Sequence, residues 1–165
     1  MPIIKKIIFI IFISLSLITH TFSASTGSSD GSPSNSTYDQ AVKLIKKAKK
    51  LEAKGKTDKA LKRYKRALKF LIKANEKKPS QPDTLNYLGF SLRKLGDYEN
   101  AEKYYLLGLK IDPKHFGINE YLGELYVLTD RIDLAKERLN MLEGCSCEEY
   151  DELKEVIEGT KKSKY

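Results

Sequence analysis

The chain has few of the residues from which catalytic and metal sites are usually built. Its 165 residues include two histidines, two cysteines, five prolines and no tryptophan. His20 lies near the N-terminus, which leaves His115 as the one histidine of the remaining chain. No Ser-His-Asp set, phosphate-binding glycine loop or buried carboxylate pair can be argued from the pattern. We therefore expect no enzyme activity, no cofactor and no metal site.

The sequence also lacks an apolar run long enough to span a bilayer. After Lys5 and Lys6, the longest such run covers residues 7–18, or twelve residues, whereas a spanning helix needs about 20. A basic start, a short apolar run and small residues at Ser23 and Ala24 predict a signal peptide over 1–24. An uncleaved anchor is the alternative, and no cysteine follows the run to carry a lipid. We expect an exported protein that is not membrane-spanning after removal of the signal, periplasmic in a Gram-negative cell and otherwise secreted.

Charge is unevenly distributed beyond a Ser-rich stretch at 25–37, which we expect to be a flexible linker. Residues 38–79 hold 16 Lys and Arg against 4 Asp and Glu, a net of +12, whereas 80–165 hold 12 against 17, a net of −5. The basic helix expected over 56–78 could contact an anionic surface or the acidic end of another copy. A solvated lysine-rich face is the simpler interpretation, and nucleic acid is a poor partner for an exported protein.

One stretch of the chain repeats with a period of 34 residues. Leu88-Gly89 recurs as Leu122-Gly123, and Ala101 recurs as Ala135. This period, with small residues at these places, is typical of stacked helix-turn-helix units. A first, divergent copy matches at an offset of 41, seven more than the period, which predicts a longer second helix; its matched residues are Gly55, Ala60, Tyr64 and Leu68 against Gly96, Ala101, Tyr105 and Leu109.

Apolar spacing and breakers predict seven helices. The first is expected to begin at Tyr38 and to be ended by Gly55, and the others are expected over 56–77, 83–95, 98–111, 117–128, 132–143 and 148–158. We expect the helix starts to be capped by Thr37 with Gln40, by Asp97, by Asp130 and by Ser146 with Glu149. Close packing between helices is assigned to Gly55, Ala60, Gly89, Ala101, Gly123 and Ala135.

These residues carry a family resemblance. Leu85-Asn-Tyr-Leu-Gly89, Gly96-Asp-Tyr98, Ala101, Tyr105 and Pro113 closely resemble a tetratricopeptide repeat. The next copy departs from it at Asp130 and Cys147, and the first copy has Lys47-Ala48 in place of Leu-Gly. Tyr121-Leu-Gly-Glu-Leu-Tyr126 also resembles small exported proteins of this family from proteobacteria.

The resemblance implies an all-α, right-handed superhelical solenoid of about three repeats. These would cover 38–81, 82–115 and 116–147, and a capping helix and tail would cover 148–165. The first helix of each repeat would line a concave groove that binds a peptide or partner protein. The implied groove residues are Ile45, Lys49, Glu52, Asn86, Phe90, Arg93, Glu120, Glu124 and Val127.

Within this groove, Phe90 is either an accessible anchor for a partner or is covered by the long second helix or the final helix. Arg93 beside Glu120 and Glu124 is expected to form at most a surface ion pair, worth under about 1 kcal/mol. The family's clamp for a C-terminal carboxylate is absent, because the implied clamp positions are Ile45, Asn86, Gly117 and Tyr121. The sequence thus favours a non-catalytic adaptor or scaffold for protein partners.

Cys145 and Cys147 leave two further functions open. In an oxidising compartment these two thiols should pair, and the disulfide would fasten the last helix to the third repeat. A thiol-redox accessory protein is the functional alternative, since Cys147 lies in the first turn of a helix, which lowers the pKa of a thiol. The charge asymmetry leaves a third alternative, a self-associating structural protein of the cell envelope.

Overall fold

The chain folds into helices joined by short loops, as the computed structural model of residues 36–161 shows. The predicted signal peptide 1–24 and nearly all of the predicted linker lie outside these described residues. Within the described range the helices are α1 (Thr37–Glu52), α2 (Thr57–Lys77), α3 (Pro82–Lys94), α4 (Tyr98–Ile111), α5 (Phe116–Leu128), α6 (Ile132–Met141) and α7 (Glu148–Ile157). The number and order of the helices agree with the sequence prediction, and their ends differ from it by a few residues.

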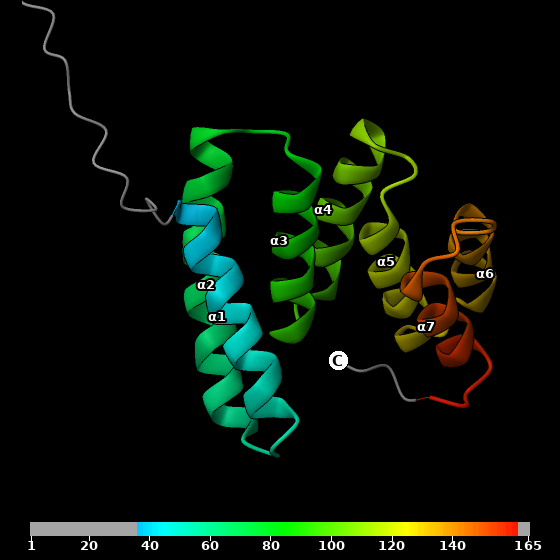
Figure 1. Ribbon diagram of the computed structural model, residues 1–165, viewed down its shortest axis with the longest axis horizontal. Coiled ribbons are helices and arrows are strands. Elements are labelled where there is room, and N and C mark those ends of the chain that lie inside the picture. Colours follow the sequence, from blue (N-terminus) through cyan, green and yellow to red (C-terminus); the bar gives the residue numbers. More distant parts are fainter. Residues whose placement is uncertain (1–35, 162–165) are drawn as a thin grey trace, which may run out of the picture. The chain divides into compact units, whose positions relative to one another are not determined.

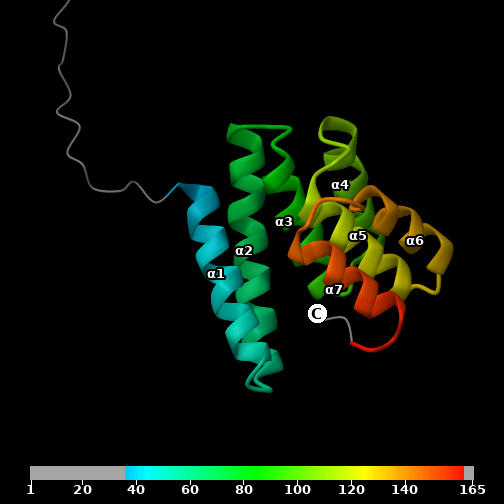
Figure 2. The same cartoon turned by 45° about the vertical axis from the view of Figure 1, so that its right-hand side comes forward.

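The helices pack as consecutive pairs that stack in chain order (Figures 1 and 2). α1 packs against α2, α3 against α4, and α5 against α6, while α2 also contacts α3 and α4 also contacts α5. The first helices α1, α3 and α5 touch one another in sequence, and α7 closes the stack against α5 and α6. This arrangement confirms the all-α class and the superhelix of helix-turn-helix units. None of the described helices is both long and apolar enough to cross a membrane.

α2 is longer than its counterpart α4 by the predicted seven residues, with 21 residues against 14. The extra turns are part of the core, since Leu71 is fully buried and Ala74 is 9% exposed. Ala74 and Lys77 of these turns line the same cavity as Thr37 and Tyr38 in the first turn of α1, which itself begins earlier than α3 does in its repeat. The insertion therefore lengthens the first helix pair without disturbing its packing.

Two glycines mark where helices approach most closely. A Cβ atom added at Gly89 would lie 2.5 Å from the Tyr105 ring, and one added at Gly123 would lie 2.5 Å from a methyl group of Leu153. Ala60, Ala101 and Ala135 are fully buried, so these small residues do set helix spacing. Gly55 was wrongly assigned to packing: it has φ +68° and nothing within 4 Å of an added Cβ, so it permits the turn after α1.

The N-terminal cap agrees with the prediction for one helix and differs from it for three helices. The Asp97 side chain accepts from the Asn100 amide and caps α4, as predicted. α1 is capped one residue earlier than predicted, because Ser36 accepts from the Asp39 amide and Asp39 accepts from the Ser36 amide.

Two predicted caps have a backbone conformation that excludes them from that role. Asp130 has φ 57° and Ser146 has φ 51°, whereas an N-cap residue typically has β-region angles. Each sits in the left-handed region just before the helix start. The caps of α6 and α7 are instead Arg131 and Cys147, neither of which makes a side-chain capping hydrogen bond.

The predicted disulfide is present between Cys145 and Cys147. The two Cα atoms lie 5.2 Å apart, in the loop that joins α6 to α7. Because the bridge closes a turn directly before α7, it restricts the path of the chain into the capping helix.

Candidate partner-binding surface

The predicted groove residues of all three repeats meet on the inner face formed by α1, α3 and α5. The Lys49 ammonium lies 4.7 Å from the centre of the Phe90 ring and 5.5 Å from that of the Tyr121 ring. It also donates to the Tyr121 hydroxyl at 3.2 Å. Side chains of the first and third repeats thus contact each other over the second repeat. They fill the inner face where we expected an open groove.

Phe90 is part of the core and does not offer an accessible anchor. Its side chain is fully buried. Its ring lies edge-on to the Tyr64 ring of α2, with 5.7 Å between the ring centres. It also packs against the Tyr121 ring of α5, with 5.0 Å between the ring centres. Of the two alternatives left open for Phe90, the structure shows the covered one, with Tyr64 of the long second helix on one side of the ring and Tyr121 on another. Aromatic pairs of this kind contribute about 0.5–1.5 kcal/mol beyond their buried area.

Arg93 and Glu124 form a buried ion pair, where the sequence predicted a surface one. A guanidinium nitrogen of Arg93 donates to a Glu124 carboxylate oxygen at 2.8 Å, and each side chain is 1% exposed. In such surroundings, loss of one partner costs about 3–5 kcal/mol because the other charge is left uncompensated. The pair therefore ties the second repeat to the third.

Three buried glutamates gather beside this pair, which the sequence did not predict. Glu120 and Glu124 come from α5 and Glu152 from α7, and their carboxylate oxygens lie within 4.8 Å of one another. Burial, then the charges of Glu124 and Glu149, raise the pKa of Glu120 to about 8. The spacing of Glu120 and Glu124 by four residues signals a shared helix face, but nothing in the sequence pairs them with Glu152.

This glutamate cluster is balanced by protein cations. Arg93 pairs with Glu124, and Lys161 lies 3.8 Å from a carboxylate oxygen of Glu152. Each glutamate could offer a ligand atom to a metal ion, but an arginine already holds the innermost carboxylate. The arrangement therefore fits a polar contact between α5 and α7 better than a metal centre.

The remaining predicted groove residues are also engaged or covered. Glu52 pairs with Lys94 and accepts from the Tyr64 hydroxyl at 2.8 Å, and burial lowers the pKa of Lys94. Ile45 is 1% exposed and Asn86 is 7% exposed. Val127, on α5, is partly buried. The inner face thus holds the solenoid together and leaves little room for a partner.

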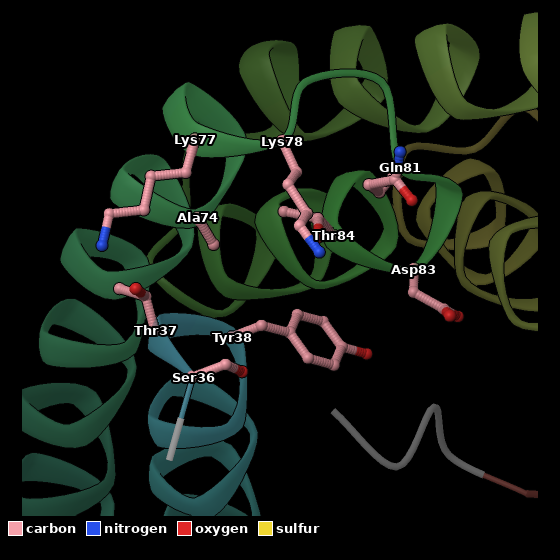
Figure 3. A pocket seen from close by; sticks show the side chains of 9 residues that line it. All are labelled: Ser36, Thr37, Tyr38, Ala74, Lys77, Lys78, Gln81, Asp83 and Thr84. Atoms are coloured by element: carbon pink, nitrogen blue, oxygen red, sulfur yellow. The ribbon is translucent and has the colours of Figure 1, made fainter. Parts of the chain in front are cut away.

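An accessible cavity lies instead at the end of the solenoid where α1 and α3 begin (Figure 3). It has a volume of about 310 Å³ and is lined by Ser36, Thr37, Tyr38, Ala74, Lys77, Lys78, Gln81, Asp83 and Thr84. In Figure 3 the side chains of Tyr38 and Lys78 extend into the space between the first turns of α1 and α3. Partial burial is the main reason that the pKa of Tyr38 is raised, and its ring packs against Tyr87 at 6.0 Å.

The seven-residue extension of α2 builds one wall of this cavity. Leu68 of α2 matches Leu109 of α4, and α4 ends two residues later at Ile111, whereas α2 continues to Lys77. The wall residues Ala74, Lys77 and Lys78 therefore all lie beyond the end of a regular repeat. The extension was visible in the sequence as an offset of 41, but the cavity that it creates was not predicted.

A second hollow lies at the start of α5, beside α7. It is lined by Asp112, Lys114, His115, Phe116, Gly117 and Glu149. His115 has a structural role here: its Nδ1 accepts from the Ile118 amide at 3.2 Å, and its Nε2 lies 3.2 Å from an Asp83 oxygen. Because Nδ1 accepts, Nε2 carries the proton and donates to Asp83.

The helix pairs, the 34-residue period and the tight glycine contacts define a helical-repeat solenoid. Residues 82–115 match the family described as tetratricopeptide repeat, and this segment covers α3, α4 and the loop that follows. Residues 82–115 therefore form a tetratricopeptide repeat. The fold is one that typically serves as a non-catalytic interaction module.

Three solved structures are among those to which the chain is similar. The second such domain of human RPAP3, in complex with an HSP70 peptide, is 15% identical over 74% of this chain and 98% of that chain, with a TM-score of 0.45. The Sgt2 domain from Aspergillus fumigatus is 19% identical over 73% of this chain and 78% of that chain, with a TM-score of 0.47. A tetratricopeptide repeat protein from Parabacteroides merdae is 17% identical over 73% of this chain and 61% of that chain, with a TM-score of 0.49. No curated protein sequence matches the chain.

Proposed function

We propose that the chain is an exported, non-catalytic adaptor or scaffold that binds a peptide segment of a partner protein in the cavity between α1, α2 and α3. The observation that carries the proposal is the cavity wall supplied by the α2 extension, a departure from the repeat that creates an accessible hollow. The filled inner face supports the same assignment, since Phe90 and Arg93 are buried within the solenoid.

The lining of the cavity suits a short polypeptide segment with an acidic or hydroxyl-bearing side chain. Tyr38 and Ala74 provide apolar surface, Lys77 and Lys78 provide two cations, and Gln81 can donate and accept hydrogen bonds. A volume of about 310 Å³ lies at the lower end of the range for ligand pockets. The site is therefore matched to a few residues of a partner and not to a whole folded surface.

Export is supported by the predicted signal peptide and by the disulfide. Cys145 and Cys147 are bonded, and disulfides persist mainly in oxidising compartments. Fractionation of cells that make the full chain tests this part, with alkylation before lysis to record the thiol state. We expect a processed, oxidised protein outside the cytoplasm; a full-length, reduced protein in the cytoplasmic fraction would contradict export.

Site-specific photo-crosslinking tests the binding site directly. A photoreactive residue placed at Lys78 or Gln81, on the cavity, should capture the same partner in cells, whereas one placed at Tyr98, an exposed position on α4, should not. Tyr38→Ala with Lys78→Glu should abolish capture from Gln81. The matched control pair Tyr98→Ala with Lys103→Glu removes the same groups elsewhere and should leave capture unchanged.

The outcomes separate a cavity site from a general interaction surface. Capture of one partner from both cavity positions, lost in the cavity variant alone, would support the proposal. Equal capture from Tyr98, or equal loss in the control pair, would show that the cavity is not the binding site.

A further inference from the structure

A row of cations runs along the outer face of α2. Lys59, Lys62, Arg66, Lys69, Lys73 and Lys77 follow one another at steps of three or four residues, so they share about 80° of the helix circumference. All six are exposed. The buried residues of α2 lie on the opposite side: Ala60, Tyr64, Ala67, Leu71 and Ala74. We call these six residues the α2 stripe.

Within the part of the chain that the structure describes, the α2 stripe is not neutralised by acidic side chains. Across residues 36–161, no ion pair joins any of its members to a carboxylate. The two acidic residues of α2, Asp58 and Glu76, lie near the ends of the stripe. Like charges spaced by four residues weaken a helix, so this arrangement is not explained by the stability of α2.

Apolar groups accompany the stripe. Phe70 is half-buried in a hollow of about 270 Å³ that it shares with Arg66, Lys69 and Lys73, and Ile72 is 42% exposed on the other side of the row. The row spans about 27 Å along a straight helix, at 1.5 Å per residue over 18 residues. The surface is thus a long, straight, cationic ridge with apolar residues on both flanks.

We propose that the α2 stripe docks on the surface of a bilayer that contains anionic phospholipid. A lipid surface presents mobile negative charges along the whole ridge, so no fixed register of partner charges is needed. Each cation brought near such a surface raises the partition coefficient about fivefold. The acidic face of α7 on a second copy suits the ridge less well, because α7 has ten residues and spans only about 15 Å, and its Glu155 is already paired with Lys161 at 2.9 Å.

Vesicle binding by the full chain tests this docking. The probes are vesicles of phosphatidylcholine and of equimolar phosphatidylcholine and phosphatidylglycerol, measured by co-sedimentation. The stripe variant carries Lys62→Glu, Arg66→Glu, Lys69→Glu and Lys73→Glu. A matched control with the same net charge carries Lys103→Glu, Lys110→Glu, Lys114→Glu and Lys136→Glu, all at exposed positions on or near α4 and α6. Any binding by the N-terminal apolar run is common to all three proteins and is reported by the neutral vesicles.

We expect the wild type to bind the anionic vesicles and to lose that binding as NaCl approaches 1 M, where the Debye length is about 3 Å. The stripe variant should bind at least about a hundredfold more weakly, while the control stays within about threefold of the wild type. No salt-dependent binding by the wild type, or equal loss in both variants, would overturn the proposal. So would vesicle-independent, salt-sensitive dimers in sedimentation velocity that the stripe variant abolishes.

Discussion

The two ends of the solenoid are built in opposite ways. At the C-terminal end, α7 packs Leu153 against Gly123. It also places Glu152 in the buried glutamate cluster with Glu120 and Glu124. At the N-terminal end, α2 leaves the six side chains of the α2 stripe in solvent, and a cavity opens between α1, α2 and α3.

The contrast is clearest at the two equivalent glycines. Gly89 is covered by Tyr105 from the second helix of its own repeat. The residue 34 positions after Tyr105 is Leu139, and Gly123 is covered instead by Leu153 of the capping helix. α7 thus replaces a missing contact and seals its end, whereas the α2 extension adds surface at the other end. The C-terminal end is therefore closed by a packed side chain, whereas the N-terminal end leaves a cavity and a charged helix face accessible.

Removal of the sealing side chain should have the largest effect on stability. Leu153 is fully buried, so we expect Leu153→Ala to lower the free energy of unfolding by about 3 kcal/mol and to speed hydrogen exchange of the α7 amides. Ile72→Ala at the open end, where the side chain is 42% exposed, serves as the control and should stay within about 0.5 kcal/mol. Urea denaturation measures both, and similar losses would show that Leu153 does not pack as a core residue against Gly123.

Ionisation of Glu120 should weaken the sealed end as pH rises. Burial and neighbouring charges raise the pKa of Glu120 to about 8 from its ordinary value of 4.5, so the folded state holds a proton that the unfolded state releases. The stabilisation is present below about pH 4.5 and is lost as pH rises toward 8. We expect the stability of Glu120→Gln relative to wild type to increase from pH 5 to pH 8, because only the wild type must ionise a buried carboxyl group over this range.

Urea titrations at the two pH values give the test for Glu120. Glu137→Gln, in which the replaced side chain is 60% exposed, is the control and should track the wild type at both pH values. If the free energy of unfolding changed equally with pH in wild type and Glu120→Gln, Glu120 would not destabilise the α5–α7 contact.

Loss of the disulfide should have a smaller effect, confined to α7. The bridge closes a loop with a sequence separation of two residues, for which chain entropy gives about 1.5 kcal/mol. We expect Cys145→Ser with Cys147→Ser to increase hydrogen exchange in α7 and to leave the protection of α1–α4 unchanged. Uniform loss of protection across all helices would contradict this confinement.

Charge changes at the open end should have the smallest effect, and one of opposite sign. Lys62→Glu with Lys69→Glu places acids three or four residues from Arg66, Lys65 and Lys73, which replaces repulsion by attraction along α2. We expect a gain of about 0.5 kcal/mol, measured as a higher thermal midpoint. A loss above about 1 kcal/mol would mean that the α2 stripe contributes to folding.

The architecture could be predicted from the sequence because it depends on local signals. The 34-residue offset from Gly89 to Gly123 and the offset of 41 in the first copy gave the helix pairs and the length of α2. The disulfide followed from the cysteine count and the expected compartment. In each case the deciding residues are close in sequence or repeat at a fixed spacing.

The site could be predicted only in part, because it depends on contacts between repeats. The groove residues do come together, yet the burial of Phe90 is decided by where Tyr64 and Tyr121 place their rings. The position of Glu152 close to Glu120 depends on how α7 packs against α5, and no periodicity in the sequence predicts that packing. The caps at Asp130 and Ser146 failed because their positive φ angles arise from the preceding turns.

The most direct test of the account is deletion of residues 71–77, the α2 extension. The shortened chain reads Leu68-Lys69-Phe70 followed by Lys78-Pro79, which aligns with Leu109-Lys110-Ile111 followed by Asp112-Pro113 and restores the regular repeat. The account predicts that the shortened protein still folds cooperatively, as judged by circular dichroism. A photoreactive residue placed at Gln81 of this protein should capture no partner. A folded deletion variant that captures the partner as well as wild type would contradict it.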